Sequence, residues 1–72
     1  MKTNRIKDLR EDRDLLQKEV ANELKISQQQ YSRYEIGMRS LPIEYLEKLA
    51  DFYNTSTDYI LGRTNEKKPY SK

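Results

Sequence analysis

The chain has 72 residues, 35% of them hydrophobic and 36% charged, and its 14 Lys and Arg against 12 Asp and Glu give a formal net charge of +2. This length suffices for one small domain, and the slight excess of positive charge is compatible with nucleic-acid binding without arguing strongly for it. The sequence contains neither Cys nor His, which excludes disulfides, thiolate or imidazole metal sites and histidine-dependent nucleophiles. We therefore expect no enzyme, no metal site and no other cofactor.

The first predicted element is a short amphipathic helix from Arg5 to about Asp12, in which Ile6 and Leu9 lie three residues apart. The residues around this helix are charged, and no apolar run has the length of a signal peptide or of a membrane span. The sequence therefore predicts a cytoplasmic, nucleoid-associated protein without a membrane partner.

A second helix is predicted over Leu16–Leu24, because Leu16, Val20, Ala21 and Leu24 fall on one helical face. Leu16 stands where a capping Ser or Thr is expected, so either Asp14 caps this helix or a side-chain cap is missing. Lys25 and Ile26 are all that remains for the turn to the next helix.

Ser27 is the predicted N-cap of a third helix, which runs from Gln28 to about Glu35 and ends before Gly37, a residue suited to positive φ. A fourth helix is predicted to carry Pro42 in its first turn and to reach about Tyr53.

Ser56 or Thr55 is expected to cap a last short helix that contains Ile60 and Leu61 and is closed by Gly62. We expect the folded domain to cover residues 1–64 and a disordered tail to cover residues 65–72.

Five short helices predict an all-α fold, and the two-residue connection between the second and third helices indicates a helix-turn-helix. In that arrangement the second of the two helices enters the DNA major groove and its first residues touch base edges. Three consecutive glutamines lie at that position, and a glutamine amide can bond bidentately to adenine.

Double-stranded DNA is therefore the expected partner, and the residues expected to contact it share polar or basic side chains on or beside the third helix. Ser27, Ser32 and the glutamines suit bases or phosphates, Arg33 suits guanine or phosphate, and the residues outside that helix suit phosphates. The predicted set is Gln17, Lys25, Ser27, Gln28, Gln29, Gln30, Ser32, Arg33 and Arg39. Within the glutamine run, base contacts are favoured for Gln28 and Gln29, whereas Gln30 is expected to face phosphate or solvent.

The segment LREDRDLLQKEVANELKISQQQYSRYEIGMR resembles the Cro and lambda-repressor type of helix-turn-helix, the XRE family. The segment LEKLADFYNTSTDYILGRT is similar to the last two helices of short repressors in that family. The resemblance covers roughly residues 4–64 and implies a five-helix lambda-repressor-like DNA-binding domain.

The resemblance also implies roles at matching positions. Arg10 and Glu35 match an internal salt bridge between the first and third helices, Ala21 matches a small residue at a close helix crossing, and Tyr31 matches a buried position. The chain departs from the family at Leu16, where a polar cap is usual, and at Met38, where a basic residue is frequent.

The function predicted from these residues is a sequence-specific transcriptional regulator, a repressor that binds a palindromic operator as a homodimer, which forms weakly without DNA. Tyr45, Phe52 and Tyr59 are either scattered surface aromatics or a dimer surface. The alternative to a repressor is an antitoxin or other protein-interaction module built on the same fold, with a secondary role for DNA. For the three glutamines themselves, the alternative to base contacts is a solvated helix face. No small-molecule ligand is expected.

Overall fold

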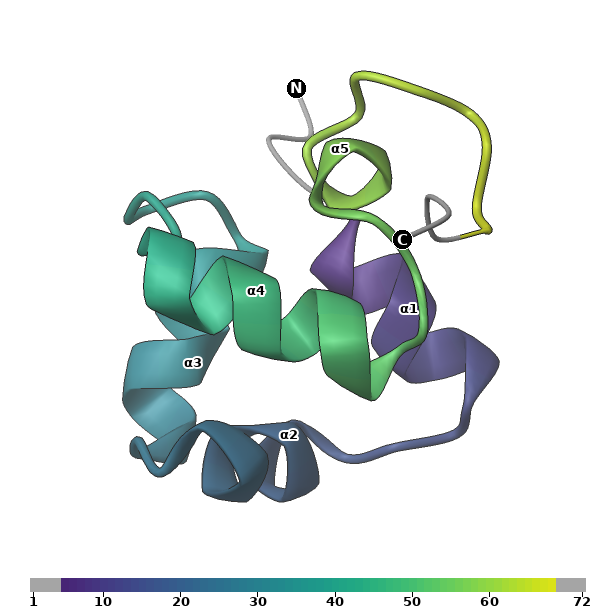
Figure 1. Cartoon of the computed structure of the whole chain (residues 1–72). Helices are drawn as coiled ribbons and strands as arrows, with labels where there is room; N and C mark the ends of the chain where they lie inside the picture. Colours follow the sequence, from purple (N-terminus) through teal and green to yellow (C-terminus); the bar gives the residue numbers. More distant parts are fainter. Residues whose placement is uncertain (1–4, 69–72) are drawn as a thin grey trace.

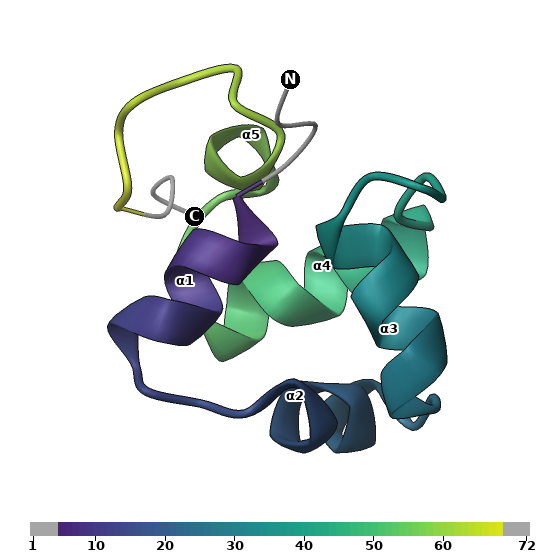
Figure 2. The same ribbon diagram turned by 180° about the vertical axis from the view of Figure 1, so that it is seen from behind.

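The computed structural model describes residues 5–68. These residues form five helices, α1 (Ile6–Asp12), α2 (Gln17–Leu24), α3 (Gln28–Glu35), α4 (Ile43–Phe52) and α5 (Thr57–Ile60). Figure 1 and Figure 2 show α2 and α5 at opposite ends of the domain, with α1 and α4 between them and α3 rising from the end of α2. No strand occurs within residues 5–68, and the prediction of an all-α, five-helix domain is confirmed.

The starts and the ends of α3 and α5 each follow from the chemistry of a single residue. The hydroxyl of Ser27 accepts a hydrogen bond from the backbone N–H of Gln30 at 3.1 Å, and the hydroxyl of Ser56 accepts one from the N–H of Tyr59 at 3.0 Å. Gly37 and Gly62 adopt φ values of 80° and 79°, which favour glycine because it lacks a Cβ. These caps confirm the predicted starts of α3 and α5, and each glycine closes the helix that precedes it.

Other boundaries differ from prediction: α1 begins at Ile6 rather than Arg5, and Leu61 is the C-cap of α5 rather than part of that helix. Helix α2 begins at Gln17 rather than Leu16. Leu16 is its N-cap and supplies no side-chain acceptor, so of the two expected alternatives the missing side-chain cap is confirmed. Instead, the Glu19 carboxylate accepts the N–H of Leu16 at 2.8 Å, which is one half of a capping box. Pro42 is the N-cap of α4 rather than a residue of its first turn, and α4 ends at Phe52, one residue earlier than expected.

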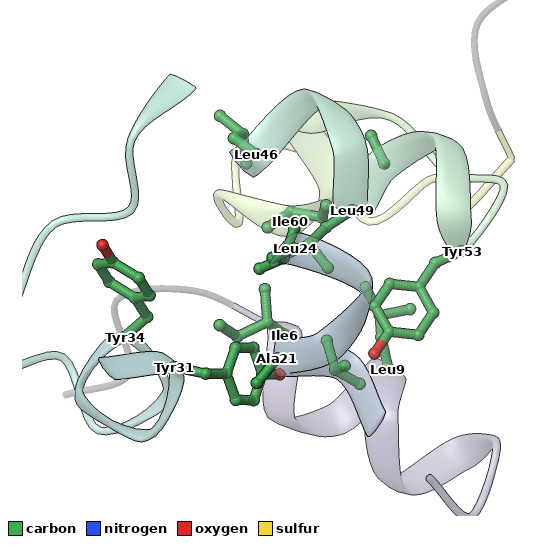
Figure 3. Packing of buried hydrophobic residues seen from close by; sticks show 12 residues of the cluster. Ile6, Leu9, Ala21, Leu24, Tyr31, Tyr34, Leu46, Leu49, Tyr53 and Ile60 are labelled. Carbon is green, nitrogen blue, oxygen red and sulfur yellow. The ribbon is translucent and has the colours of Figure 1, made fainter. Parts of the chain in front are cut away.

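The core takes residues from all five helices, which is how a chain of this length assembles one apolar cluster. Figure 3 shows the ring of Tyr31 pointing from α3 into the cluster that also contains Ile6 and Ala21. Tyr31 is 0% exposed and Ala21 is 2% exposed, so a large ring and a small side chain fill the space where α2 and α3 meet. The core residues are Ile6, Leu9, Val20, Ala21, Leu24, Tyr31, Tyr34, Leu46, Leu49, Ala50, Tyr53 and Ile60.

The segment after α5 runs back over the first helix. The guanidinium of Arg5 donates to the carbonyl of Thr64 at 3.1 Å and to Asn65 Oδ1 at 3.0 Å, and it lies 4.3 Å from the ring centroid of Tyr59. The Thr55 hydroxyl donates to the carbonyl of Lys67. The end of the domain at residue 64 stays a prediction, and the last residues of the predicted tail, 69–72, lie outside the described part of the chain.

Candidate nucleic-acid interface

The connection between α2 and α3 is closed by backbone geometry. Lys25 adopts the left-handed conformation with φ of 60° and ψ of 42°. The N–H of Ile26 donates to the carbonyl of Ala21 at 3.0 Å, and Ser27 then caps α3. This tight turn sets α3 steeply against α2, as Figure 1 shows, which is the geometry of a helix-turn-helix.

Helix α3 has an inward and an outward face. Tyr31 and Tyr34 are 0% and 4% exposed and hold the helix against the core. Ser27, Gln28 and Gln29 are exposed at its leading end, and Arg33 is partly exposed one turn further along. The apolar side chains therefore orient the helix, and the polar ones are left on the surface.

Two of the hollows beside α3 take most of their lining from its outward face. One lies between α3 and the first residue of α2 and is lined by Gln17, Gln28, Gln29, Ser32 and Arg33. The other lies between α3 and the loop before α4 and is lined by Ser27, Gln29, Gln30, Arg33, Tyr34 and Arg39.

The predicted DNA-contacting residues are brought together around these hollows. All of them except Lys25 line one hollow or the other, and Lys25 is exposed in the turn between α2 and α3. Within residues 5–68, no acidic residue lines either hollow, and Arg33 lines both, so both are suited to anionic groups. The outward face of α3 thus forms a ridge with an anion-compatible hollow on each side.

The Glu35 carboxylate, at the end of α3, joins the first three helices. Arg10 of α1 donates to it twice, from Nε at 2.6 Å and from an Nη at 3.1 Å, and Gln17 of α2 donates at 3.0 Å. The side chain of Glu35 is only 2% exposed. Burial raises the pKa of Glu35, but the hydrogen bonds from Arg10 and Gln17 outweigh it, and the pKa lies below its ordinary value.

The Tyr31 hydroxyl is buried close to this cluster. Within residues 5–68 it has no hydrogen bond of normal geometry. Burial raises its pKa above the ordinary value, and the nearby negative charge of Glu35 raises it further. Tyr31 is therefore neutral at physiological pH and acts as a core residue.

Three of the predicted DNA-contacting side chains have partners inside the domain, and one of them is Ser27, whose hydroxyl caps α3. Gln17 donates to Glu35, and Gln30 donates from Nε2 to the hydroxyl of Tyr34 at 3.2 Å. The contact between Gln17 and Glu35 joins residues 18 positions apart, so no local sequence pattern announces it. The contact between Gln30 and Tyr34 has the i, i+4 spacing of helix neighbours, a signal that the sequence did contain.

The aromatic residues predicted as a possible dimer surface each pack within the domain. Tyr45 meets Tyr34 edge to face at 6.1 Å, Phe52 meets Tyr53 at 4.9 Å, and Tyr59 lies under the guanidinium of Arg5. All three are partly buried against the core. The large apolar side chains with the greatest exposure lie elsewhere, at Ile36, Met38 and Ile43, which are 66%, 67% and 72% exposed.

Within the described residues, none of the helices has the length and apolar character that a membrane crossing requires. In the same part of the chain, no group of three or more His, Cys, Asp or Glu side chains is placed to hold a metal ion.

Comparison of the sequence with known proteins identifies relatives of this chain. A family model described as helix-turn-helix matches residues 6–60. The cryptic phage CTXphi transcriptional repressor RstR of Vibrio cholerae is 47% identical over 53 residues, which are 74% of this chain and 48% of that protein. The HTH-type transcriptional regulator ImmR of Bacillus subtilis is 41% identical over 59 residues, 82% of this chain and 46% of that protein.

A third relative, the HTH-type transcriptional regulator AnsR of Bacillus subtilis, is 34% identical over 67 residues, 93% of this chain and 58% of its own length. The chain thus spans about half the length of the first two of these relatives. No solved structure gives a significant match.

Proposed function

Because the chain belongs to the helix-turn-helix family of Cro and lambda-repressor type, we propose that it is a sequence-specific transcriptional repressor that places α3 in the major groove of operator DNA. The observation that carries the proposal is the ridge of Gln28, Gln29 and Arg33 between two hollows that have no acidic lining in the described part of the chain. A major groove about 12 Å wide admits one helix, and a phosphate backbone runs along each edge of that groove. The ridge then meets the bases and the hollows meet the two backbones.

Sequence readout is assigned to the exposed side chains at the leading end of α3. Gln28 and Gln29 can each bond bidentately to adenine, at about 1–3 kcal/mol of discrimination for a good pair. Arg33 lines both hollows and reaches either guanine or a phosphate, and Ser27 and Ser32 supply hydroxyls to either kind of group.

Phosphate contacts are assigned to Gln17, Lys25 and Arg39. Gln17 is the first residue of α2, where free backbone N–H groups and the helix dipole favour an anion. Its hydrogen bond to Glu35 fixes the side chain at that helix start. Lys25 and Arg39 flank α3 and add positive charge, which makes the affinity depend on salt.

The operator in this proposal has two-fold symmetry and is bound by two copies of the chain, weakly associated without DNA, in the bacterial cytoplasm. The repressor and regulator names of the relatives support the repressor assignment, and symmetric half-sites are the usual target of helix-turn-helix dimers.

The test is selection of bound sequences from a random pool of duplex DNA, repeated with Gln29→Ala. We expect the wild-type chain to enrich a roughly palindromic site, and the variant to lose preference at one position in each half-site. Salt-sensitive binding without any enriched sequence would contradict the proposal.

Arg39→Ala provides the matched comparison for a backbone contact. It is expected to weaken binding about equally for all sequences and to reduce the slope of log affinity against log salt by about one. A change of preference at a single base position would show instead that Arg39 reads a base.

An antitoxin or other protein-interaction module is the second candidate, favoured by the exposure of Ile36, Met38 and Ile43. Exposed apolar groups of this kind often mark protein contacts. Retention of a protein partner by a Gln28→Ala, Gln29→Ala double variant, together with its loss in Ile43→Ser, would favour this second function.

A further inference from the structure

The three consecutive glutamines of α3 occupy different environments. Gln28 and Gln29 are exposed, whereas Gln30 is partly buried. Gln30 Nε2 donates to the Tyr34 hydroxyl at 3.2 Å, one helical turn further along α3. This contact directs the Gln30 side chain along the helix surface, whereas a base contact requires a glutamine that extends away from the helix.

Tyr34 is itself fixed by the core. Its side chain is 4% exposed, and its ring meets Tyr45 of α4 edge to face with centroids 6.1 Å apart and an interplanar angle of 62°. Such aromatic pairs hold both rings in one orientation. The hydroxyl that accepts from Gln30 is therefore a rigid point on the domain.

Gln30 also lines the hollow between α3 and the loop before α4. This hollow is lined by Ser27, Gln29, Gln30, Arg33, Tyr34 and Arg39, and within residues 5–68 no carboxylate lines it. Gln29 also lines the hollow beside Gln17, whereas of these two hollows Gln30 lines only this one. Two guanidinium groups and a polar amide around one hollow match a phosphate, whose oxygens accept from all of them.

We propose that Tyr34 is a positioning residue. Its hydroxyl holds the Gln30 side chain where it contacts a phosphate of the DNA backbone, so that only Gln28 and Gln29 of the three glutamines contact bases. This inference rests on the proposed function, since it names the DNA group that each glutamine contacts. The restraint also reduces the side-chain entropy that Gln30 loses on binding.

The test compares Gln30→Ala, Tyr34→Phe and the double variant, with Gln29→Ala and Tyr45→Phe as controls. Affinity is measured on the selected site and on an arbitrary duplex, and the sequence preference of each variant is determined by selection. Tyr34→Phe keeps the buried ring, and its thermal unfolding is measured to verify that the fold is retained.

We expect Gln30→Ala to lower the affinity for both duplexes by about ten- to a hundredfold, the effect of one hydrogen bond to a charged group. Its base preference and salt slope should remain unchanged, because glutamine carries no charge. Tyr34→Phe should lower affinity in the same uniform way, and it should have little effect when Gln30 is already Ala. Tyr45→Phe should leave DNA binding unchanged.

Relaxed preference at one base position in Gln30→Ala would overturn the proposal, as would independent, additive effects of Tyr34→Phe and Gln30→Ala. If the wild-type chain enriches no sequence, the proposed sequence-specific function fails. In that case, comparing Tyr34→Phe, Gln30→Ala and the double variant on the arbitrary duplex still tests whether Gln30 contacts the DNA backbone.

Discussion

Glu35 is the residue on which the relative placement of α1, α2 and α3 depends. Its carboxylate accepts from Arg10 and Gln17, and Arg10 also donates to the carbonyl of Leu15 at 2.9 Å. A buried carboxylate of this kind adds little net stability compared with a well-packed apolar residue, but it specifies which groups must meet. The start of α2 and the end of α3 are therefore held together by side-chain chemistry as well as by core packing.

The lowered pKa of Glu35 makes stability depend on pH in the acid range. The unfolded chain takes up the proton first, near the ordinary value of 4.5, so the contribution of Glu35 is complete above that pH and is lost as the pH falls through the folded-state pKa. We expect Glu35→Gln to be less stable than the wild type at pH 7 and to lose less stability between pH 5 and pH 3. Urea unfolding at a series of pH values measures both effects.

Substitution of Glu47, an exposed carboxylate on α4, by Gln is the matched control for that experiment. It should leave the acid dependence close to that of the wild type. Parallel pH profiles for wild type and Glu35→Gln would contradict the role assigned to the buried carboxylate.

Tyr53 carries a buried hydroxyl that has no hydrogen-bond partner within residues 5–68. Burial raises the pKa of Tyr53 to about 12. The folded protein thus keeps a proton that the unfolded chain loses near pH 10, and stability falls as the pH rises from about 10 toward 12.

Removal of this hydroxyl by Tyr53→Phe is expected to leave stability at pH 7 unchanged or to raise it by up to about 1 kcal/mol, because an unpartnered buried polar group is costly. The variant should also lose less stability above pH 10. Thermal unfolding at pH 7 and pH 10.5 measures both, with Tyr45→Phe as control. A loss of more than about 1 kcal/mol at pH 7 would indicate that the hydroxyl does have a partner.

At the scale of the helices, boundaries that depend on one residue's chemistry were predictable, and boundaries set by neighbouring segments were less so. Ser27, Ser56, Gly37 and Gly62 act through their own side chain or their lack of a Cβ. Leu16 occupies the N-cap of α2 although its side chain offers no acceptor, and the Glu19 carboxylate accepts its backbone N–H. Helix α4 begins after Pro42 and ends one residue before Tyr53, the predicted end. Helix propensity alone does not set where the first and last hydrogen bonds form.

The turn between α2 and α3 stores strain at Lys25. A residue with a Cβ pays about 1 kcal/mol or more in the left-handed conformation, and glycine avoids this cost but loses more chain entropy on folding. We expect Lys25→Gly to raise stability by up to about 1 kcal/mol, or a few degrees in Tm for a domain of this size. The same variant should bind all DNA sequences more weakly, because it lacks the charge assigned to a phosphate.

Lys25→Ala separates these two effects, since it removes the charge and keeps the Cβ. It should share the loss of DNA affinity but not the gain in Tm. Equal stability of the two variants would show that the left-handed residue is not a source of strain. Unchanged affinity in both would remove Lys25 from the phosphate contacts.

At the scale of the whole molecule, the order of the helices and the apolar face of each were predictable from the periodicity of apolar residues. The helix-turn-helix was predictable from the two-residue turn. The arrangement of the candidate site was predictable only in outline. Side-chain contacts between distant segments, such as Arg5 with Thr64 and Gln17 with Glu35, follow from the fold. The partial burial of Tyr45, Phe52 and Tyr59 likewise depends on how α4 and α5 pack. The apolar face of each helix alone does not determine this packing.

The two-fold operator leads to a prediction about spacing. Two copies that place α3 in successive major grooves on one face of the duplex require inverted half-sites whose centres lie about 34–36 Å, or about 10 base pairs, apart. Insertion of five base pairs between the half-sites rotates the second site by about half a turn. We therefore expect sedimentation velocity to show two chains bound cooperatively to the first duplex, and independent, weaker binding of the second copy to the duplex with the insertion.

A duplex with a single half-site is the control for this experiment, and it should bind one chain with the affinity of an isolated site. Equal affinities for the two spacings would show that the copies do not contact one another on DNA. Cooperative binding at both spacings would place the contact outside the helical domain, because two domains of fixed shape cannot meet both on the same face and on opposite faces of a duplex.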